Sequence, residues 1–291
     1  MRPYPTDHAR PAVPFMVATG ATMLFTTMDG VLKGIPHDLP ILQVVAMRFL
    51  FGIPLVLLAI WHTQAGWPTL RSWRANGPRG VLNIASMALF YVALRRLPFA
   101  ETLTLCYLAP LIVAVLAALL LRERLRFGVL AGVLLGLGGV GVITWNALGD
   151  GVSGDIVGIL AAMGSAVSGA VNNVLLRSQA QKDSPTSIVL IQHIVPVLIA
   201  LPVVLPGWQA PAPQLWFVFP LLAVLGVGGQ FLMTWAFGRA PAGVLAVVDY
   251  LALPYAAVLG FVFFGEVPPP AVWVGATLIV AACVIVTRLR K

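Results

Sequence analysis

The chain has 291 residues, of which 59% are hydrophobic and only 10% are charged. So few charged side chains cannot cover a water-soluble globule of this size. The composition therefore predicts a membrane protein and argues against a soluble enzyme or binding domain. The formal net charge of +8 follows from basic residues gathered in loops on one side of a membrane, so it requires no nucleic-acid partner.

Ten apolar stretches follow one another along the chain, each about long enough to cross a bilayer as a helix. In chain order they lie at 12–32, 40–62, 77–95, 98–121, 127–145, 155–178, 186–205, 213–238, 242–264 and 270–288. Their polarity does not alternate over segments of about 10 residues, which argues against a membrane barrel. The sequence thus predicts an all-α membrane protein with ten transmembrane helices and short connections.

Basic residues are distributed unevenly between the predicted loops. One side carries fourteen of them, at Arg2, Arg10, Arg71, Arg74, Arg79, Arg122, Arg124, Arg126, Arg177, Lys182, Arg239, Arg288, Arg290 and Lys291, and the other side carries Lys33, Arg95 and Arg96. The positive-inside rule then predicts that both termini are cytoplasmic. Residues 1–11 are polar and precede no small-residue cleavage site, so we expect the first helix to be retained.

The second half of the chain repeats the first at an offset of 143 residues. Residues 98–126 and 241–267 carry the same phrase, in which Tyr107 falls on Tyr250 and Glu123 falls on Glu266. The sequence therefore predicts two units, 1–150 and 151–291, of five helices each. Because five is odd, the second unit enters the membrane from the opposite side, as in secondary transporters built from inverted repeats.

The repeated phrase resembles the EamA-type branch of the drug/metabolite transporter superfamily. Each half has a proline at the start of the phrase, a mid-helix proline (Pro110 or Pro254) and a glutamate about a dozen residues later, and residues 46–51 read AMRFLF. Within that family the chain is similar to YddG-like exporters of amino acids and related metabolites. The second half departs from the pattern where Ile191 stands opposite Arg48.

A glutamate at the carboxyl end of a helix faces the negative pole of that helix's dipole. Glu123 and Glu266 are therefore not expected to stabilise the helices that they follow. Each precedes the next helix directly, so we expect each to cap the free amides of that following helix, with Arg122, Arg124 and Arg126 assisting in the first half. Direct contact with a substrate is the alternative.

Polar side chains recur at helical spacing within four predicted helices that form two repeat-related pairs. We interpret them as the lining of one shared cavity, while the alternative is that the hydroxyls bond to their own helices. The candidate substrate-binding residues are Thr22, Thr26, Asp29, Arg48, Asn83, Ser86, Tyr91, Glu101, Tyr107, Ser165, Ser168, Asn172, Gln230, Thr234, Asp249 and Tyr250.

Five ionisable groups lie within the predicted helices: Asp29, Arg48, Glu101, His193 and Asp249. Asp29 and Arg48 could form a salt bridge, or could receive the ammonium and carboxylate groups of a zwitterion. Asp249, beside Tyr250 in the helix that contains Pro254, is the best single candidate for a gating or cation-contacting group. His193 leaves proton coupling open, and a hydrogen-bonded structural histidine is the alternative.

The four histidines lack paired ligand spacing, and both cysteines, Cys106 and Cys283, lie within apolar stretches. We therefore expect no metal, cofactor or disulfide. Gly128, Gly132 and Gly136 recur every four residues, which allows close contact either with the last helix of the chain or with a second protomer. The oligomeric state, monomer or homodimer, stays open.

The sequence predicts a non-enzymatic transporter in the bilayer of a prokaryotic inner membrane that exports amino acids or similar small metabolites by alternating access. Phosphorylated substrates fit less well, because Arg48 is the clear basic residue inside the predicted bundle. The alternatives are a multidrug or lipophilic-cation exporter, for which Asp249 would be essential, and a membrane-embedded lipid-processing enzyme, which would form a product.

Overall fold

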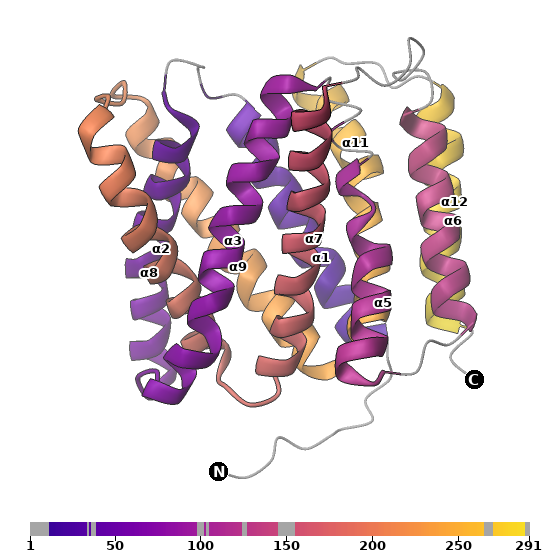
Figure 1. Ribbon diagram of the computed structural model, residues 1–291, viewed down its shortest axis with the longest axis horizontal. Helices are drawn as coiled ribbons and strands as arrows, with labels where there is room; N and C mark the ends of the chain where they lie inside the picture. Colours follow the sequence, from indigo (N-terminus) through magenta and orange to yellow (C-terminus); the bar gives the residue numbers. More distant parts are fainter. Residues whose placement is uncertain are drawn as a thin grey trace.

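The computed structural model describes residues 12–33, 35, 39–97, 102, 105–123, 127–144, 155–264 and 270–288, and these residues are all-helical (Figure 1). The first half contains α1 (Ala12–Lys33), α2 (Ile41–Thr63), α3 (Leu70–Arg96), α5 (Ala109–Leu121) and α6 (Phe127–Thr144). The second half contains α7 (Ile156–Gln179), α8 (Pro185–Val204), η2 (Leu205–Gly207), α9 (Leu215–Arg239), α10 (Ala242–Ala246), η3 (Val247–Leu251), α11 (Ala252–Phe264) and α12 (Pro270–Arg288).

Helices lie in all ten predicted stretches. Six segments of the described chain are long and apolar enough to cross a membrane, and three shorter apolar helices lie at Ala109–Leu121, Phe127–Val142 and Pro270–Val286. Several membrane-spanning helices are therefore confirmed, whereas a total of ten spans with cytoplasmic termini stays a prediction.

The start of α3 differs from the prediction. The third stretch was expected to begin at residue 77, with Arg79 in a loop, but α3 begins at Leu70 because the Thr69 side chain accepts the Ser72 N–H at 3.2 Å and caps the helix. Hydropathy alone does not detect this polar first part of the helix. Arg79 consequently lies inside α3 and is only 2% exposed, so its loop assignment was wrong.

The helix predicted at 242–264 is interrupted. After α10 the chain forms the 3-10 turn η3 and then continues as α11. Pro254 explains the break, because a proline has no N–H to offer the carbonyl four residues earlier, which belongs to Tyr250. A discontinuous helix exposes backbone polar groups within the bundle, which is a common feature of transporter binding sites.

The two halves pack as a pseudo-two-fold pair. The repeat pairs α1 with α7, α3 with α9 and α5 with α11. The contact between α1 and α9 therefore has its equivalent between α7 and α3, and the contact between α5 and α7 has its equivalent between α11 and α1. In Figure 1, α1 and its repeat mate α7 run in opposite directions. The repeat-equivalent rings of Tyr107 and Tyr250 lie 6.1 Å apart. Equivalent residues that touch must lie at the axis, so these two tyrosines mark it.

The glycines of α6 allow it to pack closely against α12. A Cβ at Gly132 would lie 3.2 Å from the Ala282 carbonyl oxygen, and one at Gly139 would lie 2.8 Å from that of Gly275. The predicted contact with the last helix of the same chain is confirmed for Gly132. Gly136 instead receives the ring of Tyr250, so α6 also supports the axis.

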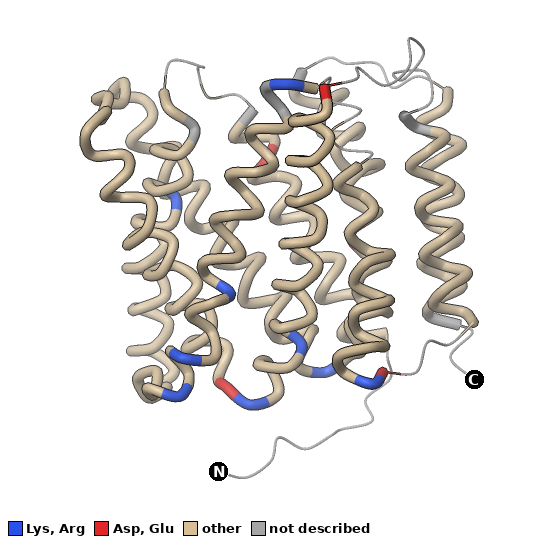
Figure 2. Tube along the Cα trace, viewed as in Figure 1, with Lys and Arg blue, Asp and Glu red and all other residues tan. Residues whose placement is uncertain are grey.

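Charged residues gather at the two ends of the bundle (Figure 2). We call the lower end in this view the basic end, because α3 begins there and α5, α7 and α9 end there, with Arg71, Arg74, Arg122, Arg177, Lys182 and Arg239. The opposite end carries the ion pair between Arg96 and Asp155, at 3.3 Å.

Candidate functional site

Arg48 of α2 lies where several helices meet. Its guanidinium donates to Met28 Sδ of α1 at 3.1 Å and to Met87 Sδ of α3 at 3.8 Å, and it lies 4.4 Å from the centroid of the Phe49 ring. No carboxylate oxygen of the described residues lies within 4.0 Å of it. A guanidinium inside a membrane bundle that has only neutral partners is costly and is, by default, a functional group.

Asp29 of α1 is close enough to interact electrostatically with Arg48, and also with Tyr91 and Tyr107. The two charged groups nevertheless form no ion pair in the described chain. The Asp29 side chain is exposed. Asp29 and Arg48 thus lie near each other without a direct ion pair in the described chain.

Tyr250 at the pseudo-two-fold axis is fully buried, and its hydroxyl has no hydrogen-bond partner in the described chain. The Thr22 hydroxyl and the Gln230 amide oxygen are also buried without a partner. Asp249 interacts electrostatically with Tyr107 and Tyr250. Because buried polar atoms are nearly always satisfied, these three unpartnered atoms are candidate contacts for water or a ligand.

The polar side chains of α3 and α7 satisfy one another instead. Ser86 donates to the Ser165 carbonyl at 3.0 Å, and Ser165 donates to the Ser86 carbonyl at 2.9 Å. The repeat mates of these two serines are Gly229 and Thr22. Glycine offers no hydroxyl, so the contact between the Ser86 and Ser165 hydroxyls, at 3.2 Å, has no counterpart at Thr22.

Other predicted site residues occupy varied positions. Thr26 donates to the Thr22 carbonyl at 2.9 Å, and Thr234 is 3% exposed. Asn83 and Ser168 are half-buried. Glu101 lies outside the described residues. The cavity assignment of these residues stays a prediction.

His193 is held by its own helix, because its Nδ1 lies 2.8 Å from the Val189 carbonyl oxygen. The ring also packs edge-on against Phe49, with centroids 5.3 Å apart, and against Gly52, where any side chain would collide with it. These contacts agree with the structural alternative for this histidine.

Arg79 is an interior charge that hydropathy missed. Its Nε donates to Asn172 Oδ1 at 3.2 Å, and its Nη1 donates to Asn76 Oδ1 at 3.0 Å. Asn76 in turn donates to Asp183 at 2.8 Å. This network binds α3 of the first half to α7 of the second and engages Asn172, one of the predicted site residues. The cap signal Thr69-x-x-Ser72 is the sequence feature that indicates the longer helix.

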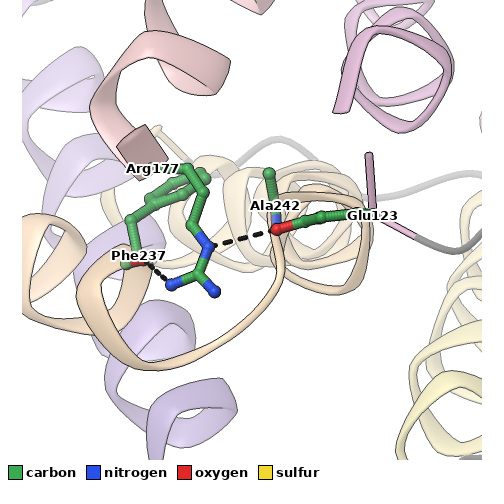
Figure 3. A network of polar contacts seen from close by, with 4 residues as sticks. All are labelled: Glu123, Arg177, Phe237 and Ala242. Carbon is green, nitrogen blue, oxygen red and sulfur yellow. Dashed lines mark hydrogen bonds and ion pairs between the residues drawn. The ribbon is translucent and has the colours of Figure 1, made fainter. Parts of the chain in front are cut away.

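Glu123 caps a helix in the other half of the chain (Figure 3). Its Oε2 accepts the N–H of Ala242, the first residue of α10, at 3.0 Å, and its Oε1 accepts from Arg177 Nε at 3.1 Å. Folding thus brings α10 of the other half to Glu123, whereas residues 124–126, just before α6, lie outside the described residues, so the expected cap of α6 stays a prediction. Glu266, Arg124 and Arg126 lie outside the described residues.

Comparisons with known proteins agree with this architecture. The model of the EamA-like transporter family matches residues 14–145 and again 156–288. The chain therefore belongs to the EamA-like transporter family, and it is a membrane transporter of the drug/metabolite type.

Similar proteins carry chemically different solutes. The chain is 27% identical to the pseudopaline exporter CntI of Pseudomonas aeruginosa, covering 95% of this chain and 96% of that one. It is 24% identical to a riboflavin transporter of Vibrio cholerae (94% and 92% covered) and 25% identical to an S-adenosylmethionine uptake transporter of Rickettsia prowazekii (86% and 83%). A solved crystal structure superposes with a TM-score of 0.83 at 25% identity, covering 95% of this chain and 99% of the other.

Proposed function

We propose that this transporter exports amino acids or similar small metabolites that carry a carboxylate, across a bacterial inner membrane and by alternating access. The proposed frame has ten transmembrane helices in two inverted repeats, 1–150 and 151–291, with both termini in the cytoplasm. The excess of basic residues at one end of the bundle supports this orientation (Figure 2).

The observation that carries the proposal is the state of Arg48. An interior guanidinium whose polar partners are two methionine sulfurs can gain a charge-assisted, bidentate bond from an entering carboxylate. Asp29, which interacts electrostatically with Arg48 without forming an ion pair in the described chain, is suited to the ammonium group of the same solute. Together the two groups favour a zwitterion over a purely cationic drug.

The axis supplies the rest of the proposed site. The hydroxyls of Tyr250 and Thr22 and the amide oxygen of Gln230 are unpartnered in the described chain and offer hydrogen bonds to a solute near the bilayer midplane. Inverted-repeat transporters commonly bind substrate there, beside discontinuous helices such as the one interrupted at η3.

Among similar proteins, the pseudopaline exporter CntI matches over nearly the whole chain, which supports export of a small metabolite as the proposed direction. Other relatives act in uptake, so direction requires its own test.

The test is counterflow of a panel of radiolabelled amino acids in liposomes that contain the purified protein, with and without a proton gradient. We expect saturable counterflow that other amino acids compete. Its response to the gradient decides whether protons are coupled. Absence of counterflow across the panel would contradict the proposed substrate class, and transport of lipophilic cations that requires Asp249 would favour the drug-exporter alternative.

A further inference from the structure

The ion pair at the end of α5 joins the two halves of the molecule. Helix α5 ends at Leu121, and the next residue, Arg122, caps it with a positive φ of 54° and an N–H that bonds the Ala117 carbonyl. The Glu123 N–H bonds the same carbonyl at 3.2 Å. These two hydrogen bonds to one carbonyl fix the turn after α5 and therefore the direction in which the Glu123 side chain points.

One carboxylate makes two contacts with the second half (Figure 3). It accepts the Ala242 N–H at the start of α10 and the Arg177 Nε–H of α7, and Arg177 Nη1 reaches the Phe237 carbonyl of α9 at 2.6 Å. The network therefore ties α5 of the first half to α7, α9 and α10 of the second. The carboxylate lies at the carboxyl end of α5, where the helix dipole disfavours a negative charge. Its favourable partners, the Ala242 N–H and Arg177, belong to the second half.

An apolar cluster lies against this network. Val113 and Ala117 of α5 pack with buried residues of α7, α9 and α10, including Val174, Phe237 and Leu245. Any pathway that opens between α5 and the second half at the basic end must separate this cluster. The same movement must break both contacts of Glu123.

The contact is suited to repeated opening. The side chains of Glu123 and Arg177 are 20% and 15% exposed, so water can reach both groups as they separate. Separating a partly exposed ion pair costs less than separating a deeply buried one, because water hydrates the separated groups.

We propose that Glu123 is a gating residue of the transport cycle. Its carboxylate keeps the basic end closed through Arg177 and the Ala242 N–H, and both bonds break in the state that opens there. We call this set the Glu123 gate. The inference rests on the proposed alternating-access function, but it concerns the basic end of the bundle and is independent of the substrate.

The test is thiol labelling of the full-length protein in lipid nanodiscs, where both faces are accessible. Cys106 and Cys283 are replaced by alanine, and Ala117→Cys serves as the reporter because Ala117 is 1% exposed beside the gate. A water-soluble maleimide then measures how often this end opens. Ala93→Cys, at a site that is 0% exposed near the opposite end of α3, reports general unfolding.

We expect Glu123→Gln and Arg177→Gln each to raise the labelling rate at position 117 by roughly tenfold. The double variant should raise it by little more, because all three variants lose the same ion pair between Glu123 and Arg177. Glu123→Ala should exceed Glu123→Gln, since the glutamine oxygen can still accept the Ala242 N–H. Arg122→Gln, an exposed neighbour, is the matched control and should label at the background rate. Position 93 should stay protected in every variant.

Labelling at the background rate in both Glu123→Gln and Arg177→Gln would overturn the gate, whatever the protein transports. Equal acceleration at positions 117 and 93 would also overturn it, because the variants would then unfold rather than open. Faster labelling at 117 alone, in a protein that shows no amino-acid counterflow, would support the gate and reject only the proposed substrate class.

Discussion

Arg48 and Arg79 are both interior arginines, yet their surroundings assign them different roles. Arg79 donates to the side-chain oxygens of Asn76 and Asn172, whereas the polar partners of Arg48 are the sulfurs of Met28 and Met87. The first is satisfied by the fold, and the second gains most from a ligand. Hydropathy identified Arg48 because it lies in an apolar run, and missed Arg79 because the residues before it are polar.

Stability measurements should separate the two residues. We expect Arg79→Met to lower the free energy of unfolding by about 2–4 kcal/mol, because it leaves the buried oxygens of Asn76 and Asn172 without their donor. Arg48→Met should leave stability unchanged or raise it, since removal of an interior charge with neutral partners strands no acceptor of comparable strength. Denaturation in detergent measures both, with Arg71→Met as the exposed control. An equal loss for Arg48→Met would make Arg48 a structural residue.

The close packing of α6 is an element-scale feature that the sequence predicted, although it left open whether the partner is the last helix or a second protomer. Gly128, Gly132 and Gly136 at helical spacing predicted a close helix contact, and Gly132 makes it against α12. Gly139, which was not in the predicted set, also lies against α12. The contact between α3 and α7 was harder to predict from the sequence. Ser86 and Ser165 were identified as polar, but only the fold brings their hydroxyls to each other's carbonyls.

Two adjacent glycines of α6 provide a matched test. A Cβ at Gly139 would lie 2.8 Å from the Gly275 carbonyl oxygen, whereas one at Gly138 would have nothing within 4 Å. Gly138→Ala should therefore stabilise the protein by up to about 1 kcal/mol through helix propensity. Gly139→Ala should destabilise it despite the same gain, because α12 must move. Thermal unfolding of the two variants compares them, and equal effects would contradict this packing.

The cap of α7 should make stability depend on pH. The pKa of Asp155 is lowered from its usual value near 3.8, first because its carboxylate accepts the Gly158 N–H and then because of Arg96. A lowered pKa means that the stabilisation is fully present above the ordinary value and is lost as the pH falls through the folded-state value. The stability difference between the native protein and Asp155→Ala should thus be constant from pH 7 to pH 5 and shrink in stronger acid. A difference that persists unchanged in strong acid would exclude the ionised cap.

At the scale of the whole molecule, the repeat was the most informative feature of the sequence. The 143-residue offset placed Tyr107 opposite Tyr250, and their rings meet in the structure. The ten apolar runs located the helices because each run is long. The partner of Glu123 was not predictable, since the sequence spacing of 119 residues to Ala242 carries no local signal, and only the packing of α5 against α10 brings them together.

Orientation is tested by thiol labelling in intact cells, in a protein whose two native cysteines are replaced. Ala212→Cys, in the exposed link between α8 and α9, should react with an impermeant reagent from outside. Arg74→Cys, which is also exposed but lies at the basic end, should react only after the membrane is opened. The reverse pattern would show that the basic end faces outward.

The central claim is that Arg48 receives the carboxylate of the transported solute. The most direct measurement compares an amino acid with its carboxamide analogue as competitors of counterflow, in the native protein and in Arg48→Gln. The native protein should prefer the carboxylate by roughly 10- to 100-fold, as expected for one charge-assisted bond of about 1.5–3 kcal/mol, and Arg48→Gln should lose that preference. A preference of equal size in both proteins would place the carboxylate elsewhere and contradict the account.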